Sequence, residues 1–242
     1  MLKFVRFIGF VENDVLKDMK LLKFSNILTI LYFVNLAVYS VFSLLNDEEN
    51  GKYFWFVRIP ILMVLYLISS REKKIIYFIG LLLYQLASVL FFTGNPDLFI
   101  FGTFSSVLFK FCLVLLVLDL VIKKRRLAIF FASLPFFVLY LYVIELVVVS
   151  LGDSYYIWII NALLTSFLGG VSIIHYLNDS DEKGYWLLIS AVLFIVQIAA
   201  FFINKFYVKS EGIYQMVILS YGISHYTFYR FLILREQEKI PV

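Results

Sequence analysis

Long apolar segments alternate with short polar connections along most of the chain. Each apolar segment is roughly 18 to 25 residues long, and at ~1.5 Å per residue this is the length that a helix needs to cross the ~30 Å hydrocarbon core of a bilayer. The connections are too short to hold a soluble domain, so consecutive helices should be antiparallel neighbours. We therefore predict an all-α integral membrane protein with short loops and eight transmembrane helices. The expected spans are 26–45, 53–70, 75–92, 98–122, 127–150, 155–177, 185–204 and 212–234.

The first part of the chain, residues 1–25, has a different pattern. Apolar residues recur at helical spacing, as in Phe4, Ile8 and Val11, while most basic residues lie elsewhere. This pattern is typical of an amphipathic helix on the cytoplasmic membrane surface. A signal peptide is the alternative, but the apolar run is short, Glu12-Asn13-Asp14 interrupts it and no small-residue cleavage site follows. We expect three parts: a cytoplasmic N-terminal segment 1–25, a transmembrane domain 26–234 and a cytoplasmic tail 235–242.

The composition supports lipid as the solvent of this chain. Of its 242 residues, 62% are hydrophobic and 16% are charged, and the mean hydropathy is +0.92. A soluble domain has ~45–50% apolar and ~25% charged residues, so the apolar surplus here cannot be buried in one soluble core. The net charge of +4 is modest, and no soluble basic domain offers a nucleic-acid surface. The single cysteine, Cys112, excludes an internal disulfide framework.

The basic residues predict the orientation of the helices. Positive charge gathers in loops on the cytoplasmic side of membrane proteins, and Lys123 to Arg126 form the densest basic cluster of this chain. If the N-terminus is cytoplasmic, most other basic loop residues fall on the same side, and only Lys52, Lys205 and Lys209 fall outside. We therefore predict that both termini are cytoplasmic. Aromatic residues at the span ends agree: Tyr53, Trp55, Tyr155, Tyr156 and Trp158 would mark the external boundary, and Tyr185 and Trp186 the internal one.

A few ionisable residues fall inside the predicted spans. Each costs ~2.5–3.5 kcal/mol at mid-membrane, so each needs a partner or a wet cavity. We predict that Arg58, Lys110 and Glu145 cluster in the external half of the bundle. Such a cluster can be an ion pair that fixes helix packing, or a pocket in which Glu145 acts as a base or the cations hold an anionic head group. Separate snorkelling to the interface is the third alternative. Asp119 should pair with Lys123, four residues further on.

Two predicted helices carry polar stripes. In the sixth, Asn161 begins a row of small and polar residues that can either pack closely against a neighbour or line a cavity. In the eighth, Tyr221 and His225 belong to a polar stripe, and His225 lies near mid-membrane, where its imidazole should form an interhelical hydrogen bond or belong to a site. Ser88 and Gln197 are further buried polar candidates. The two histidines lie at different depths, so we expect no metal site, and no cofactor motif is present.

Several local strings resemble one known family. Arg58-Ile-Pro60 opens the second predicted helix with a basic residue and a proline. Leu86-Ala-Ser88 and Leu193-Phe-Ile-Val-Gln197 lie in the third and seventh helices, and Tyr221-Gly-Ile-Ser-His225 lies in the eighth. With the eight short-looped helices, these strings resemble the YhhN-type lysoplasmalogenases, a family of bacterial and animal membrane proteins. Lys110 falls near the position of the family's helix 4 histidine.

The resemblance implies an eight-helix fold in the bacterial inner membrane and hydrolysis of the vinyl ether bond of lysoplasmalogens. That reaction needs a proton donor for the enol-ether carbon and an activated water. The chain departs from the family at two aspartates, which are Ser88 and Gln197 here and do not titrate. Glu145 is then the deeply placed carboxyl group left to serve.

Three functions remain open. The first is a divergent lysoplasmalogenase or lysophospholipid hydrolase, with Glu145 and His225 as catalytic groups. The second is a catalytically inactive relative that binds lipids or a partner protein, and the third, a small transporter, lacks the paired helix breaks of inverted repeats. Membrane lipids, including lysophospholipids, are the expected partners. If Glu145 and His225 face one cavity, the enzyme is favoured; if they do not, the binding protein is. The expected substrate-binding residues are Arg58, Lys110, Gln197, Tyr221, Asn161 and Ser88.

Overall fold

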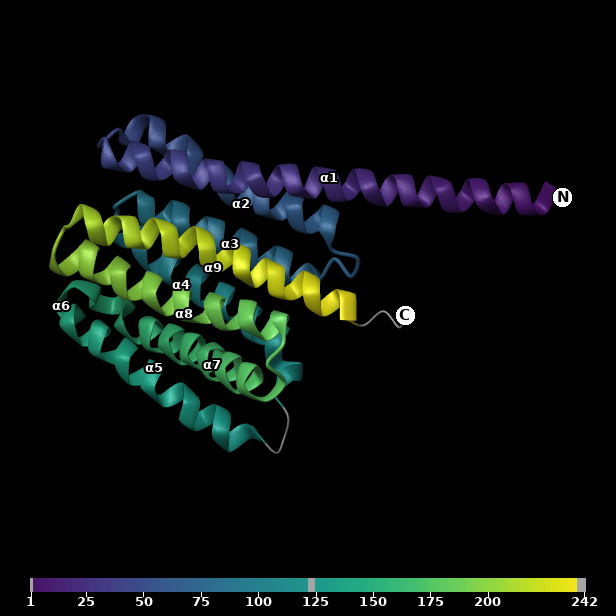
Figure 1. Cartoon of the computed structure of the whole chain (residues 1–242). Helices are drawn as coiled ribbons and strands as arrows, with labels where there is room; N and C mark the ends of the chain where they lie inside the picture. Colours follow the sequence, from purple (N-terminus) through teal and green to yellow (C-terminus); the bar gives the residue numbers. More distant parts are fainter. Residues whose placement is uncertain (1, 122–124, 239–242) are drawn as a thin grey trace.

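The computed structural model describes residues 2–121 and 125–238, and the side chains of these residues from Leu21 onward except that of Glu48. The described residues form helices and short turns, with no β-strand among them. Figure 1 shows the long helices running roughly side by side in one bundle, with the start of α1 and the end of α9 at the same end. The predicted all-helical class is therefore confirmed.

Eight long helices make up the described part of the bundle, and short helical segments follow some of them. Each long helix matches one apolar segment of the sequence. The long helices are α1 (Leu2–Leu44), α2 (Glu48–Ser69), α3 (Ile75–Phe92), α4 (Pro96–Val117), α5 (Arg126–Leu146), α7 (Tyr155–Asp179), α8 (Glu182–Phe202) and α9 (Glu211–Glu238). The short segments are the 3₁₀ turns η1 (Leu118–Leu120) and η3 (Gly152–Ser154), the single turn α6 (Val148–Leu151) and the π-helical turn η4 (Ile203–Tyr207).

Seven helical stretches of the described chain are long and apolar enough to cross a membrane, judged by length and composition alone. Much of their apolar surface lies on the outside of the bundle, as with Leu22, Leu127 and Phe131. A soluble monomer rarely exposes apolar patches of such extent, so lipid is the solvent that fits this surface. The chain is therefore an integral membrane protein. The eighth long helix, α9, is not among the seven.

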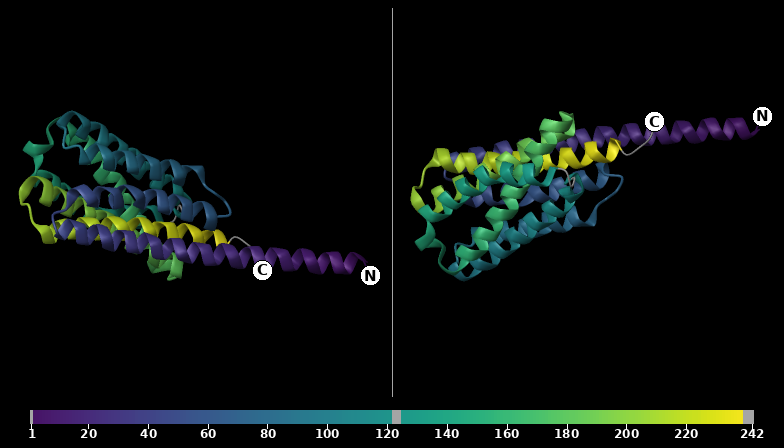
Figure 2. Two further views of the ribbon diagram at one scale, coloured as in Figure 1. Left: turned by 90° about the horizontal axis from the view of Figure 1, so that it is seen from above. Right: turned by 90° about the horizontal axis from the view of Figure 1, so that it is seen from below.

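The N-terminal segment and the first predicted span form one helix. α1 runs from Leu2 to Leu44 without a break at the predicted boundary near residue 25, and neither Gly nor Pro interrupts the sequence from Phe10 to Leu45. Figure 2 shows the first part of α1 projecting beyond the other helices in both views. The segment is helical as predicted, and its position on the cytoplasmic membrane surface stays a prediction. The last four residues of the predicted tail, 239–242, lie outside the described residues.

Two spans end earlier than the sequence predicted. α4 stops at Val117 and continues only as the turn η1, whereas the predicted span ran to residue 122. α5 stops at Leu146, whereas the predicted span ran to residue 150. Three consecutive valines begin at Val147, and β-branched residues lose side-chain freedom in a helix, which favours the break there. Gly152 then takes a φ of 48°, which turns the chain into α7.

The predicted cytoplasmic end of the bundle is fastened by the last turn of α9. The buried carboxylate of Glu236 accepts hydrogen bonds from the Ser70 hydroxyl at 2.8 Å and from the Arg71 backbone N–H at 3.0 Å. Arg235 donates to the Leu116 carbonyl oxygen at 2.6 Å and pairs with Asp119. Lys123, the predicted partner of Asp119, lies outside the described residues. These contacts hold the α2–α3 turn and the end of α4 against α9.

Candidate functional site

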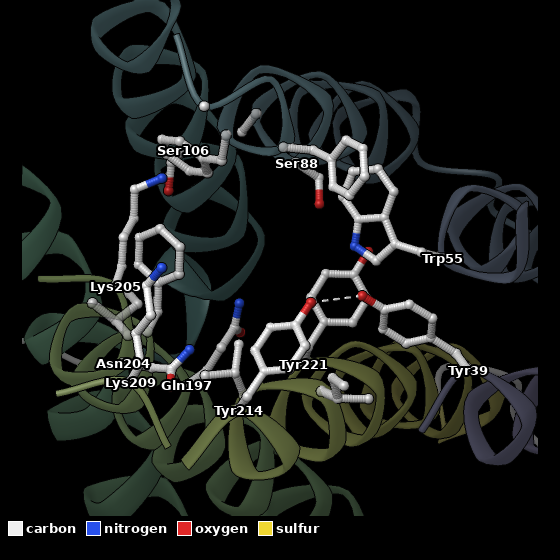
Figure 3. A pocket seen from close by; sticks show the side chains of 18 of the residues that line it. Tyr39, Trp55, Ser88, Ser106, Gln197, Asn204, Lys205, Lys209, Tyr214 and Tyr221 are labelled. Carbon is white, nitrogen blue, oxygen red and sulfur yellow. Dashed lines mark hydrogen bonds between the residues drawn. The ribbon is translucent and has the colours of Figure 1, made fainter. Parts of the chain in front are cut away.

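A cavity of about 770 Å³ lies between the helices. Its walls come from α1, α2, α3, α4, α7, α8 and α9, and Asn46, Gly94 and Ser210, in the turns at one end of the bundle, also line it. This end, where α1, α3 and α8 stop, is the predicted external end. Figure 3 shows side chains of these elements surrounding an open centre. The cavity therefore reaches from the predicted external surface into the membrane-spanning part of the bundle.

Arg58, on α2, is the most unusual group in the lining. Its side chain is fully buried, and its guanidinium lies near two aromatic rings, with Cζ 5.0 Å from the Tyr39 ring centroid and 4.4 Å from that of Tyr221. None of its three guanidinium nitrogens has a hydrogen-bond partner among the described residues. A cation–π contact contributes up to ~2 kcal/mol when desolvated, which offsets only part of the cost of burying a charge. The charge of Arg58 therefore lacks a counter-ion among the described residues.

The Tyr39 ring that covers Arg58 is held by a seam between α1 and α9. The Tyr39 and Tyr214 hydroxyls are 2.9 Å apart and hydrogen-bonded (Figure 3). At the adjacent positions, the Ser40 hydroxyl donates to Gln215 at 2.5 Å, and Gln215 in turn donates to Glu211 at 2.6 Å. Polar contacts thus join the two helices along the cavity wall.

Two uncharged side chains point into the cavity from opposite walls. Figure 3 shows Ser88 of α3 on one side and Gln197 of α8 on the other. The Gln197 amide Nε2 donates to the Tyr84 hydroxyl at 2.8 Å, while its Oε1 has no partner among the described residues. Four of the residues predicted to bind substrate therefore line one cavity: Arg58, Ser88, Gln197 and Tyr221.

Asn161 lies behind the cavity wall and organises it. Its Oδ1 accepts hydrogen bonds from the Tyr140 hydroxyl at 3.1 Å and the Thr165 hydroxyl at 3.2 Å, and its Nδ2 donates to Ser106 Oγ at 3.0 Å. Ser106 lines the cavity, whereas Asn161 does not. The residue predicted to contact substrate is therefore a support for one that faces the cavity.

The lining carries an excess of positive charge. Arg58, Lys205 and Lys209 are cationic, and within the described part of the chain Glu211 is the one carboxylate in the lining. Glu211 already accepts hydrogen bonds from Ser43 at 3.1 Å and from Gln215. No group of three or more His, Cys, Asp or Glu side chains among the described residues is placed to hold a metal ion. The cavity is thus suited to an anion rather than a cation.

The predicted cluster of Arg58, Lys110 and Glu145 does not form. Glu145 is exposed on α5, which packs against α7 and α8, and it does not line the cavity. No ion pair joins it to either cation in the described part of the chain. The face that α5 turns inward was not predicted correctly, because its apolar residues are spread over all faces. This prediction was wrong.

His225 and Lys110 are buried in the bundle outside the cavity lining. His225 is buried, its Nδ1 is 2.8 Å from the Tyr221 carbonyl oxygen, to which it must donate, and its ring centroid is 4.2 Å from that of Tyr84. The Lys110 amine lies 3.4 Å from the Phe194 ring centroid, and neither residue lines the cavity. Glu145 and His225, the predicted catalytic pair, therefore do not face a common space.

Several lining residues were not predicted as site residues. Trp158 was expected as a boundary anchor, but it is almost fully buried, and Lys205 was read only as an external loop cation. Tyr39, Tyr84 and Ser106 carried no prediction. A weak signal did exist, because Tyr84 precedes Ser88 by one helical turn and Trp158 precedes Asn161 by three residues, so each shares a helix face with a predicted residue.

Comparison of the chain with protein-family models, with curated proteins and with solved structures gives no match. The function must therefore be argued from the cavity itself.

Proposed function

We propose that this protein binds an anionic lipid in the cavity between its helices and does not hydrolyse it. The observation that carries the proposal is the buried guanidinium of Arg58, which has no hydrogen-bond partner among the described residues and lines a cavity with an excess of positive charge. A phosphate or carboxylate head group would supply the missing acceptors through charge-assisted bonds, which are the stronger kind. The aromatic lining, with Trp55, Phe91 and Phe201, suits the apolar part of such a ligand.

The proposal favours a binding protein over a hydrolase for a geometric reason. Acid–base hydrolysis needs a proton donor and a base within reach of one substrate. Glu145 faces outward from α5, and His225 lies behind Tyr84 and Tyr221. Glu211, the carboxylate in the described lining, is held in the seam between α1 and α9.

Ligand binding tests the proposal directly. The purified protein in phosphatidylcholine nanodiscs is titrated with hexadecyl phosphate, hexadecanol and hexadecyltrimethylammonium, and binding is followed by native mass spectrometry. We expect saturable binding of the phosphate alone. Arg58→Met should weaken it by at least ~10-fold, because a charge-assisted pair is lost, and Arg71→Met, at an exposed position outside the cavity, should not. Equal binding of all three probes, or an unchanged affinity in Arg58→Met, would contradict the proposal.

A turnover assay distinguishes the proposed binding function from hydrolysis. The protein is incubated with lysoplasmalogen and with lysophospholipids, and release of aldehyde or fatty acid is followed. We expect none from the wild-type chain. Turnover that disappears in His225→Ala but persists in Lys52→Ala would replace the binding function with hydrolysis.

The number of spans, the orientation of the chain, its membrane and its family are part of the same proposal. We propose eight spans with both termini in the cytoplasm, in the inner membrane of a bacterium, and a distant relationship to the YhhN-type lysoplasmalogenases. The distribution of basic loop residues supports the orientation. The position of the cavity at the predicted external end means that its ligand would come from the external leaflet.

A further inference from the structure

A second group of hydrogen-bond donors lines the cavity away from Arg58. It consists of Ser106 on α4, Trp158 on α7 and Lys205 on the π-helical turn η4. The Lys205 amine lies 5.2 Å from the Phe99 ring centroid, and the Phe99 ring lies 6.4 Å from that of Trp158. Figure 3 shows Ser106 and Lys205 on the side of the cavity opposite Trp55 and Tyr39. Three helical elements thus bring their donors to one corner.

The donors in this corner have no acceptors among the described residues. The Trp158 indole N–H is buried and unpartnered, and Lys205 forms no ion pair within the described part of the chain. Ser106 Oγ accepts a hydrogen bond from Asn161. The Asn161 amide cannot turn round, because its oxygen already accepts from Tyr140 and Thr165. The Ser106 hydroxyl proton therefore remains available to the cavity.

Two neutral donors and a cation that line one cavity suit an oxygen that carries several lone pairs and a negative charge. A hydroxyl-bearing or cationic ligand would leave the charge of Lys205 without a counter-charge. π-helical turns are also frequent at functional sites, and this one places Lys205 beside Phe99 of α4.

We propose that Ser106, Trp158 and Lys205 form an oxyanion subsite separate from Arg58. The ligand of this cavity then carries two acidic groups, a phosphate and either a carboxylate or a second phosphate. This inference rests on the proposed function, because both subsites belong to one cavity, but it assigns residues and a ligand chemistry that the proposed function does not require.

A matched pair of lipids tests the subsite. N-acetyl and N-succinyl lysophosphatidylethanolamine share the acyl chain and the phosphate, and only the succinyl form adds a carboxylate. Native mass spectrometry of the wild-type protein at pH 7.5 should show the succinyl form binding at least ~10-fold more tightly, the gain expected from one charge-assisted pair. Lys205→Met and Trp158→Phe should each reduce this preference, measured as the ratio of the two affinities in the same variant. Lys52→Met is the matched control, since Lys52 belongs to the same end of the bundle but does not line the cavity.

The outcomes separate the two proposals. If both lipids bind with equal affinity, the second subsite is overturned and the proposed function stands. If neither lipid binds although hexadecyl phosphate does, only the second subsite is overturned; if hexadecyl phosphate also fails to bind, both are. If the succinyl preference persists in Lys205→Met and Trp158→Phe, the second acidic group is recognised elsewhere and the assignment of these residues fails.

Discussion

Arg58 illustrates how a single residue can cost stability and still be useful. A guanidinium in the membrane-spanning part of a protein is expensive, and here two tyrosine rings replace the hydrogen bonds that it would form in water. A residue retained only for packing would be better replaced by an apolar side chain of similar volume. When an anion binds, the free-energy cost of burying the Arg58 guanidinium is offset, because the charge then has a partner.

Replacement of Arg58 by methionine should therefore stabilise the empty protein. We expect the free energy of unfolding without ligand to rise by ~1–4 kcal/mol, as when buried ionic groups are exchanged for apolar ones. The stabilisation that hexadecyl phosphate gives the wild type should be lost in the variant. Thermal unfolding in detergent, with and without the lipid, measures both. A variant less stable than wild type in the empty state would show that Arg58 has a structural role instead.

The residues of the cavity could be predicted in part because polar groups are rare in these helices. Arg58, Ser88, Gln197 and Tyr221 stood out for that reason, and all four line the cavity. Glu145 stood out equally and points away from it. The difference depends on how α5 is rotated about its axis, and rotation is set by packing between helices, which an almost uniformly apolar sequence does not encode in its periodicity. Trp158 was misread because an aromatic residue near a span end suits both the interface and a buried wall.

At the scale of helices, α5 is located by its close contact with α7. A Cβ added to Gly170 on α7 would lie 2.6 Å from the Ile129 carbonyl oxygen of α5, closer than real atoms pack. Small residues at such contacts let helix backbones approach in lipid.

Gly170→Ala should accordingly destabilise the protein by ~1–3 kcal/mol through overpacking, and push α5 away from α7. Gly212→Ala is the matched control, because the nearest atom to a Cβ there is 3.9 Å away, and a small gain in helix propensity is expected instead. Thermal unfolding of the two variants in detergent compares them. Equal stability of Gly170→Ala and wild type would mean that the α5–α7 contact adjusts freely.

The α2–α3 turn depends in a similar way on one carboxylate of another helix. Glu236 accepts the Ser70 hydroxyl and the Arg71 N–H, so this turn is tied to the end of α9. Glu236→Ala should cost ~1–3 kcal/mol, because it leaves buried donors unsatisfied. Amide hydrogen exchange should accelerate at residues 70–72 and change little near Asn95 at the other end of α3. Glu49→Ala, at an exposed position on α2, serves as the control, and unchanged protection of the turn would contradict this role.

Each of the eight predicted apolar segments forms one long helix, yet α9 falls outside the seven stretches that satisfy length and composition. The physical reason is its position. Several of its polar residues, including Ser220, Ser224 and His225, are buried, and it packs against α8 and α1. Hydropathy averaged over all faces of a helix underestimates a span whose polar face is covered by protein, because lipid meets only the remaining apolar face.

The span count can therefore be decided by the two ends of α9. In a Cys112→Ala background, single cysteines at Asn50, Asp97 and Lys209 should react with a membrane-impermeant maleimide from the external face, and those at Arg71, Asn178 and Gln237 only after the membrane is opened. The pair Lys209 and Gln237 is decisive, since they flank or end α9 and should label from opposite faces if it spans. Labelling of both from one face would leave seven spans and put the two ends of the chain on opposite sides. The cavity would then lose a wall inside the bilayer, because Tyr214 and Tyr221 come from α9.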